Sequence, residues 1–351
     1  MAYATINDPS AHFQTALYNG SSSSVTVTND GNSDLQPDWL WIKSRSSTHN
    51  HDTFDSSRGM TSKRLFPNLT NAEDSNGIAS VTSDGFTTGT SLGNINTNGE
   101  NYVAWQWKAN GGTTSSNSDG SITSTVQVNT TAGFSIITYS GNGSNNATVG
   151  HGLGAAPQLI ITKNRSATYN WVTWSEELSS TKIMVIDMDL AEFTPSGGYY
   201  SNVGSSTYQL VQGSSNLTNV NANGNDYVAY CFRSIQGYSK FGKYTGNGSA
   251  DGSFVYTGFK PAWVMIKCTN AAKNWYIFDN KRPGYNVINR LISPNSSAAE
   301  VDGSEKIDLL SNGFKLRQDF SHTNASGSTY LYMAFAQEPL VGTNNIAATA
   351  E

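Results

Sequence analysis

The feature of the sequence that most constrains the fold is a short pattern that occurs three times. Each copy starts with a proline, continues through a largely apolar run and reaches a lysine six positions later. The copies are Pro37–Lys43, Pro157–Lys163 and Pro261–Lys267. An asparagine follows thirteen positions after each proline, and an aromatic residue lies four positions further on. Agreement at so many fixed offsets predicts three tandem copies of one structural unit.

A tyrosine-apolar-alanine-aromatic segment predicts the last strand of each copy. The segments are Tyr102–Trp105, Tyr227–Tyr230 and Tyr332–Phe335, and they begin 65, 70 and 71 residues after the prolines. Both kinds of segment are rich in β-branched and aromatic residues, and Gly-rich turns separate them, as is typical of short antiparallel strands. We therefore expect an all-β chain of three tandem β-sandwich or jelly-roll-like repeats.

Composition and register together divide the chain. We expect a docking segment over residues 1–12, repeats over 13–109, 121–236 and 237–341, a linker over 110–120, and a tail over 342–351. The linker is predicted to be flexible because it consists mainly of Gly, Ser, Thr and Asn. The second and third repeats join at Gln236 and Gly237 with almost no spacer, so we expect tighter packing there. One short helix is predicted, around Tyr285 to Leu291.

The predicted strands are apolar on both faces. In Trp39–Ile42 the tryptophans fill one face, while Leu40 and Ile42 fill the other. A half-buried strand would alternate apolar and polar residues, so the second face needs a loop, a helix or a neighbouring domain as cover. With Trp105 and Trp107, the aromatic residues exceed what one such domain must bury. This excess predicts a homo-oligomer, with a trimer favoured; the alternative is that long loops after the three lysines cover the rings.

Composition bears on the class of function. Charged residues make up 13% of the chain and the net charge is -5, so no basic patch favours nucleic-acid binding. No apolar stretch is long enough to predict a membrane span. The first residues lack the features of a signal peptide, and release within a phage particle is one expected route out of the cell. The two cysteines, Cys231 and Cys268, are predicted to be buried thiols without zinc.

Three acidic or histidine-containing segments raise the question of a metal site. His49–Asp52 contains two histidines, but the other copies lack histidine at these positions, which favours a solvated loop. Asp30–Asp34 and Asp251–Gly252 resemble calcium loops only loosely, and their spacing favours turns. We expect no metal, no cofactor and no metal-ligating residues.

Catalysis is not expected either. Glu176 and Glu177 are adjacent, and Asp187 and Asp189 form a second acidic pair, but no spacing places two carboxylates across a cleft. His151–Gly154 lacks the Lys-Ser/Thr of a phosphate loop and is interpreted as a turn that leads into a strand. The sequence therefore predicts a non-enzyme without catalytic residues, and it leaves the ligand-binding residues unknown.

Two Asp/Arg pairs recur between the first and third copies. They are Asp55 with Arg58 and Asp279 with Arg282, and the second copy has Ser175 and Leu178 instead. We expect structural ion pairs rather than a shared functional site, because the second copy does without them.

Five segments carry a family resemblance. They are Thr5–Phe13, Leu35–Arg45, Val149–Pro157, Asn274–Arg282 and Tyr332–Ala336. In these segments, and over nearly its whole length, the chain resembles tandem-repeat virion proteins of marine tailed bacteriophages, often described as tail-fibre-like. The resemblance implies a structural protein located in the virion, with other virion proteins and a host cell-surface glycan or protein as partners. A tail-associated fibre or adhesin is the function we expect. The alternatives are a capsid decoration or head-fibre protein and, less favoured, a secreted carbohydrate-binding module.

Overall fold

The computed structural model describes residues 4–90, 92–179, 181–196, 199–211, 220–342 and 347–350. Almost all regular structure in these residues is strand, so the predicted all-β class is confirmed. The helices of the described residues are a 3-10 turn, η1 (Pro9–Ala11), and one short α-helix, α1 (Gly93–Asn96). No helix among these residues is long and apolar enough to span a membrane.

Each repeat contributes an inner antiparallel sheet with the same strand order. The first sheet is β1 (Phe13–Asn19), β7 (Asn101–Trp107), β3 (Trp39–Ser44) and β4 (Asp52–Asp55). The third is β18 (Ser239–Thr245), β25 (Thr329–Pro339), β20 (Phe259–Cys268) and β21 (Tyr276–Asp279). The second, β10 (Phe134–Ser140), β17 (Asp226–Phe232), β12 (Leu159–Asn164) and β13 (Val172–Ser175), extends to β14 (Met184–Val185) at one edge and through β9 (Ser124–Asn129) to β8 (Ser115–Asn117) at the other.

The registers of these sheets correspond residue by residue. Trp39 pairs with Trp107, Leu159 with Phe232, and Trp263 with Phe335. The segments that follow the prolines therefore lie in corresponding strands, as their common register predicts.

The closing strand of the third copy is in register from Tyr330, two residues before the predicted start of its motif at Tyr332. Tyr18 pairs with Tyr102 and Tyr139 with Tyr227, but Tyr244 pairs with Tyr330 rather than Tyr332. The reason is ring stacking, because the two tyrosines of each pair lie parallel with centroids 5.0, 5.0 and 5.1 Å apart. Tyr330 thus corresponds to Tyr102, and Met333 to Trp105.

An outer sheet of three or four strands covers one face of each inner sheet. These sheets are β2 (Thr26–Thr28), β6 (Gly85–Thr87) and β5 (Ser80–Thr82); β11 (Ala147–Gly150), β16 (Thr207–Val211) and β15 (Tyr199–Ser201); and β19 (Phe254–Tyr256), β24 (Gly313–Leu316), β23 (Val301–Leu310) and β22 (Ile288–Leu291). A separate apolar core fills each sheet pair, for example Leu40 and Phe54 against Phe86 in the first repeat. Each repeat is therefore sandwich-like.

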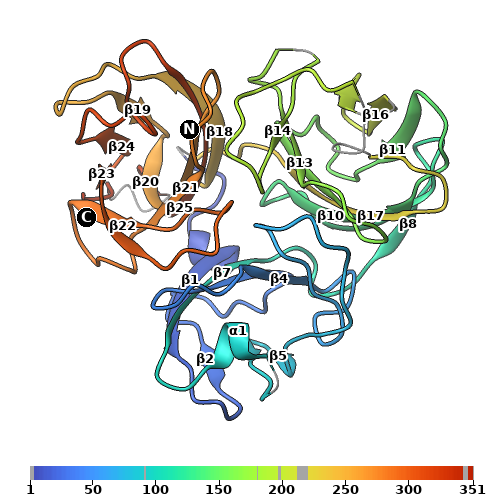
Figure 1. Cartoon of the computed structure of the whole chain (residues 1–351), viewed down its shortest axis with the longest axis horizontal. Coiled ribbons are helices and arrows are strands. Elements are labelled where there is room, and N and C mark those ends of the chain that lie inside the picture. The colour runs from blue at the N-terminus through green and yellow to red at the C-terminus, as the bar shows by residue number, and fades with distance from the viewer. Residues whose placement is uncertain are drawn as a thin grey trace.

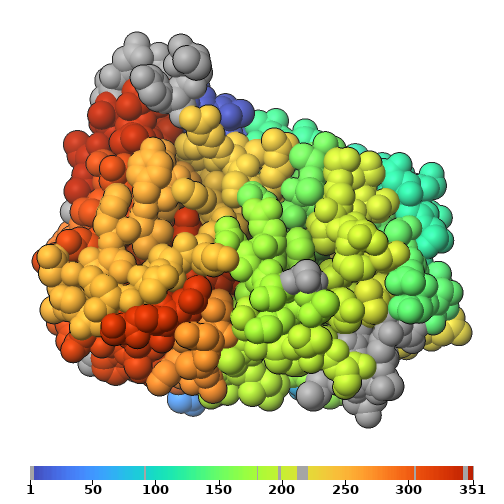
Figure 2. Space-filling model, turned by 90° about the horizontal axis from the view of Figure 1, so that it is seen from above, coloured from blue at the N-terminus to red at the C-terminus, as the bar shows by residue number. Residues whose placement is uncertain are grey.

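The other faces of the three inner sheets meet in one aromatic core at the centre of the molecule. Trp39 stacks on Trp107 of its own repeat and on Tyr230 of the second, with centroids 4.4 Å apart in both cases. Trp107 in turn contacts Trp263 and Phe335 of the third repeat. Figure 1 shows the three repeats as lobes around this common centre, and Figure 2 shows the second and third repeats side by side.

This arrangement removes the basis of the predicted homotrimer. Trp41, Trp105 and Trp107 are at most 1% exposed, and the cover comes from the neighbouring repeats of the same chain. No second chain is needed to bury these rings, and residues that follow the lysines, such as Leu65, Trp171 and Trp275, belong to the same core. The three inner sheets that share this core all belong to one chain.

Two further expectations need correction. The segment predicted as a helix contains β22, in which Ile288 and Leu291 pair with β23. Residues 110–120 are not a free linker, since they include β8 and the Asp38 carboxylate accepts hydrogen bonds from Gly111 and Gly112 nitrogens, both at 2.8 Å.

The described part of the expected docking segment packs on its own chain. Ile6 is 5% exposed and belongs to the central core, and the Thr5 amide donates to the Gln236 carbonyl. Residues 1–3 lie outside the described residues. In the tail, the Ala348 amide donates to Leu340, while 343–346 and 351 lie outside the described residues.

Candidate functional site

The three junctions between repeats use the same sequence position, the fourteenth after each proline. The Trp171 indole donates to the Phe66 carbonyl at 2.8 Å, and the Trp275 indole donates to the Val185 carbonyl at 2.9 Å. His51 takes this place in the first repeat, where its Nε2 lies 3.1 Å from the Ser293 carbonyl. Trp41 donates to His51 Nδ1, which leaves the proton on Nε2 for that carbonyl. The second repeat binds the first, the third binds the second and the first binds the third, so the chain closes into a ring.

The recurrent Asp/Arg pairs lie inside two of these junctions. Arg58 donates to Asp55 and to Glu73, and the Tyr230 hydroxyl of the second repeat donates to Asp55 at 2.6 Å. The Arg58 and Asp55 side chains are fully buried. Glu73 also accepts two bonds of 2.9 Å from Arg165 across the junction. The prediction of a structural ion pair is confirmed.

The junction between the third and first repeats has the same arrangement. Arg282 and Asp279 are fully buried, and the Trp105 indole of the first repeat donates to Asp279 at 2.9 Å. Glu300 accepts two bonds of 2.9 Å from Arg45. The remaining junction has Ser175 and Leu178 at the corresponding positions, and Leu178 and Met333 both belong to the central core.

All three repeated lysines are buried, and two of them donate across a junction, whereas Lys43 donates to carbonyls of its own repeat. Lys163 donates to the Thr70 carbonyl of the first repeat at 2.8 Å, and Lys267 donates to the Asp189 carbonyl of the second at 3.3 Å. Burial lowers the pKa of Lys163 to about 7 and that of Lys43 and Lys267 to about 8.

The expected solvated loop at His49–Asp52 is wrong for its second half. His51 and Asp52 are fully buried, because His51 occupies the junction position that tryptophan fills in the other repeats. Burial lowers the pKa of His51 to about 3 and raises that of Asp52 to about 7. Within the described ranges, no group of three or more His, Cys, Asp or Glu side chains is arranged to hold a metal ion.

The acidic residues that the sequence singled out lie apart and have ordinary partners. Glu176 and Glu177 lie in the turn after β13, not within a strand. Asp187 accepts from the Trp171 amide at 2.9 Å, and Asp251 pairs with Lys315.

The remaining sequence candidates are structural as well. His151 lies in the turn region between β11 and β12 and is fully buried. Its Nε2 lies 3.1 Å from the Gly204 carbonyl. Cys231 and Cys268 are both free and buried, as expected.

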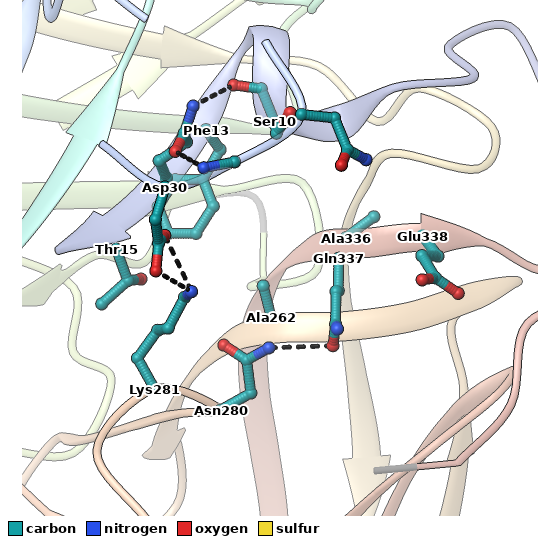
Figure 3. Close-up of a pocket in the computed structure, with 13 residues that line it drawn as sticks. Ser10, Phe13, Thr15, Asp30, Ala262, Asn280, Lys281, Ala336, Gln337 and Glu338 are labelled. Atoms are coloured by element: carbon teal, nitrogen blue, oxygen red, sulfur yellow. Dashed lines mark hydrogen bonds and ion pairs between the residues drawn. The ribbon is translucent and has the colours of Figure 1, made fainter. Parts of the chain in front are cut away.

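A hollow of about 230 Å³ lies where the third repeat meets the first, and we call it the closure pocket. Thr15 of β1 and Ala262 of β20 form its floor, and they are 4% and 9% exposed. Asp30 and Lys281 stand on its rim and join across the junction, with Lys281 Nζ 2.8 Å from both carboxylate oxygens. Figure 3 shows this pair opposite the strand end that carries Gln337 and Glu338.

The polar groups of the closure pocket include acceptors and donors. The Asn280 amino group donates to Gln337 Oε1 at 2.8 Å, and this bond leaves Asn280 Oδ1 and Gln337 Nε2 for other partners. The Thr15 hydroxyl is buried and has no hydrogen-bond partner among the described residues. Sequence reasoning missed this site, although the aligned repeat openings place Thr15 where the other copies have Ile136 and Phe241.

Comparison with known proteins gives a family without an assigned function. The model of a domain of unknown function, DUF7483, matches residues 8–339. No curated protein and no solved structure shows a significant match to the chain. The match spans all three repeats, including the junction between the third and the first. The chain therefore belongs to the DUF7483 family.

Proposed function

We propose that this chain is a structural component of a bacteriophage virion, a tail-associated fibre or adhesin protein that contacts the host surface. The virion assignment draws on the resemblance described above. The adhesive role draws on the surface that the ring presents.

The observation that carries the proposal is a set of three corresponding polar tips. Each tip consists of two turns at the same end of an inner sheet: residues 20–23 with 97–100, 142–146 with 222–225, and 247–250 with 325–328. The turns are held together by a backbone bond from Gly143 to Asn221 and by one from Gly248 to Asn324. A side chain on Gly141 would meet the Ala222 carbonyl at 2.3 Å, so a glycine is required for this close approach.

Apart from Glu100, which pairs with His49, the residues of the tips are uncharged, and most of them are Ser, Thr, Asn and Gly. Ser21 to Ser23, Asn223 and Ser326 are examples, and all are exposed. Three such tips on one rigid body would bind a repetitive surface with higher avidity than a single tip. Hydroxyl and amide side chains also form adaptable hydrogen bonds at binding surfaces. These properties suit attachment to a host-cell glycan or protein.

The proposal is tested on particles. An antibody against the chain should label the tails of purified virions, and the purified chain should compete with virions for adsorption to host cells. Labelling of the shell would favour the capsid decoration or head-fibre function instead. Washed particles that lack the chain by mass spectrometry would refute the virion assignment.

A further inference from the structure

The closure pocket lies at the one junction that no chain connection crosses. β7 leads into the second repeat, and β17 leads into the third, whereas the third and first repeats meet without a covalent link. At the first junction Asp38 and Gln127 accept the amides of the connecting segment, including those of Gly111 and Gly112. At the second junction Gln158 accepts the Ser234 amide at 2.6 Å. At the first and second junctions, the connecting chain thus occupies the position that is hollow at the third.

The third junction lacks both the connecting chain and the side chain that would hold it. The residue that corresponds to Asp38 and Gln158 is Ala262, the first after the proline. Its methyl group leaves space where the other repeats have a carboxylate or an amide. The result is an open hollow with the Asp30–Lys281 pair at its rim.

Thr15 is the second residue that is smaller than its counterparts in the other repeats, and it makes the hollow deeper. By register with the closing strands, Thr15 corresponds to Ile136 and Phe241, which are buried in the central core. Thr15 is smaller and polar, and its buried hydroxyl has no partner among the described residues. Figure 3 shows this hydroxyl on the side of Thr15 that faces Lys281. A buried hydroxyl without a partner is costly for a folded protein, and a ligand that binds it removes that cost.

The lining chemistry indicates which ligand fits. Two carboxylates, Asp30 and Glu338, face one ammonium group, Lys281, so the lining has a formal charge of -1 and does not favour an anion. Asn280 Oδ1 is an acceptor and Gln337 Nε2 is a donor, and both are neutral. Each hydroxyl of a sugar donates one hydrogen bond and accepts others, which matches a mixed set of this kind.

The size of the pocket limits the ligand further. Its volume of about 230 Å³ is below the range of about 300–1,000 Å³ for sites that enclose drug-sized ligands. The methyl groups of Ala262 and Ala336 and the ring of Phe13 supply an apolar surface for one face of a small ring. We propose that the closure pocket binds a single neutral sugar ring, such as the terminal residue of a glycan. As a host-glycan contact, this inference rests on the proposed function.

The test is direct binding of monosaccharides to the purified full-length chain. Saturation-transfer NMR would screen glucose, galactose, mannose, fucose, N-acetylglucosamine and N-acetylgalactosamine, with glucuronate as the anionic comparison. Methyl NMR would then locate the site, and we expect at least one neutral sugar to shift the signals of Ala262 and Ala336. Glucuronate should bind more weakly than its neutral counterpart, because Asp30 and Glu338 repel its carboxylate.

Two variants test the site itself. Thr15→Val removes the hydroxyl with little change of shape and should weaken binding about three- to tenfold, the effect of one hydrogen bond. Ala262→Gln introduces the residue of the second repeat and should abolish binding by filling the hollow. Thr173→Val is the matched control, because it removes another buried hydroxyl without a partner in the described structure, in β13 outside the closure pocket. Thermal unfolding verifies that each variant is folded.

The outcomes separate this inference from the proposed function. No transfer to any sugar of the panel, or equal binding by folded Ala262→Gln protein, would overturn the inference. Binding that depends instead on the exposed rings of Phe254 and Tyr256 would also overturn it. In each of these cases, tail labelling and adsorption competition could still support the adhesin. Sugar binding by a chain that is missing from particles would leave the pocket valid and refute the function.

Discussion

The buried ion pair at the first junction allows a sharp test of how the ring is held together. Arg58→Leu introduces the residue that the second repeat has at the corresponding position, Leu178. It leaves the fully buried Asp55 carboxylate with the Tyr230 hydroxyl as its remaining side-chain donor. The double variant Asp55→Ser/Arg58→Leu introduces both residues of the second repeat and removes both charges of the buried Asp55–Arg58 pair, while Glu73 stays paired with Arg165.

The expected magnitudes differ between the two variants. Removing one partner of a buried ion pair costs about 3–5 kcal/mol, because the other charge stays buried. The double variant loses the acceptor of the Tyr230 hydroxyl, which costs about 1–3 kcal/mol, while Glu73 keeps its two bonds to Arg165. The unfolding entropy of a chain of 351 residues is about 0.7 kcal/mol/K, so the melting temperature should fall by about 4–7 °C for Arg58→Leu and about 1–4 °C for the double variant.

The assay is thermal unfolding followed by circular dichroism at pH 7, with Arg290→Leu as the control. Arg290 and Asp302 are 43% and 58% exposed, so this variant should change stability by less than about 0.5 kcal/mol. The reasoning is refuted if Arg58→Leu melts within 1 °C of the parent. It is also refuted if the double variant loses as much as the single variant.

Three further predictions concern titration and assembly. His51→Trp places the tryptophan of the other repeats at this junction position. The folded-state pKa of His51 is about 3, and its ordinary value is about 6.5. Relative to the variant, the parent should therefore lose up to about 1.4 kcal/mol of stability per pH unit as the pH falls below 6.5. Denaturant unfolding between pH 4 and 7.5 measures this difference, and parallel curves would contradict it. Lys163→Met should show a dependence of the same sign in a higher pH range. The folded-state pKa of about 7 lies below the ordinary value of about 10.4, so the parent gains stability over the variant as the pH rises between these values, and a constant difference from pH 7 to 10 would rule this out. Finally, light scattering across a dilution series should give a monomer whose fluorescence resists iodide, because seven of its eight tryptophans are at most 2% exposed; a stable trimer would show that surfaces other than these rings drive assembly.

Much of the local structure was predictable because strands of this kind have clear periodic signals. The proline-to-lysine runs form inner strands, and the Asp/Arg pairs are buried ion pairs, as their repetition indicated. The cover of the second apolar face was harder to predict, since a loop, another domain or a second chain would bury Trp39 and Trp41 equally well. Only the contacts between repeats decide among these, and the contact of Trp171 with Phe66 spans 105 residues.

Two predictions were wrong, the register of the last closing strand and the helix near Tyr285, because residue types alone did not reveal the packing there. Tyr332–Phe335 fits the closing motif by composition, but stacking of Tyr330 on Tyr244 sets the register. The predicted helix near Tyr285 failed because Ile288 and Leu291 are buried residues of an edge strand. The closure pocket could have been anticipated from Thr15 and Ala262, the small residues at positions where the other copies are large, but only once the ring was known.

The ring within one chain has a consequence for how such a protein can diverge. In a trimer of identical subunits every substitution occurs at all three junctions at once, so a change that opens a hollow at one junction opens it at each. Here each junction is encoded separately. Ser175 and Leu178 could replace an ion pair at one junction, and Thr15 and Ala262 could open another, while the remaining contacts kept the ring closed. Encoding the three repeats in one chain thus leaves each junction free to change at the stability cost of a single site.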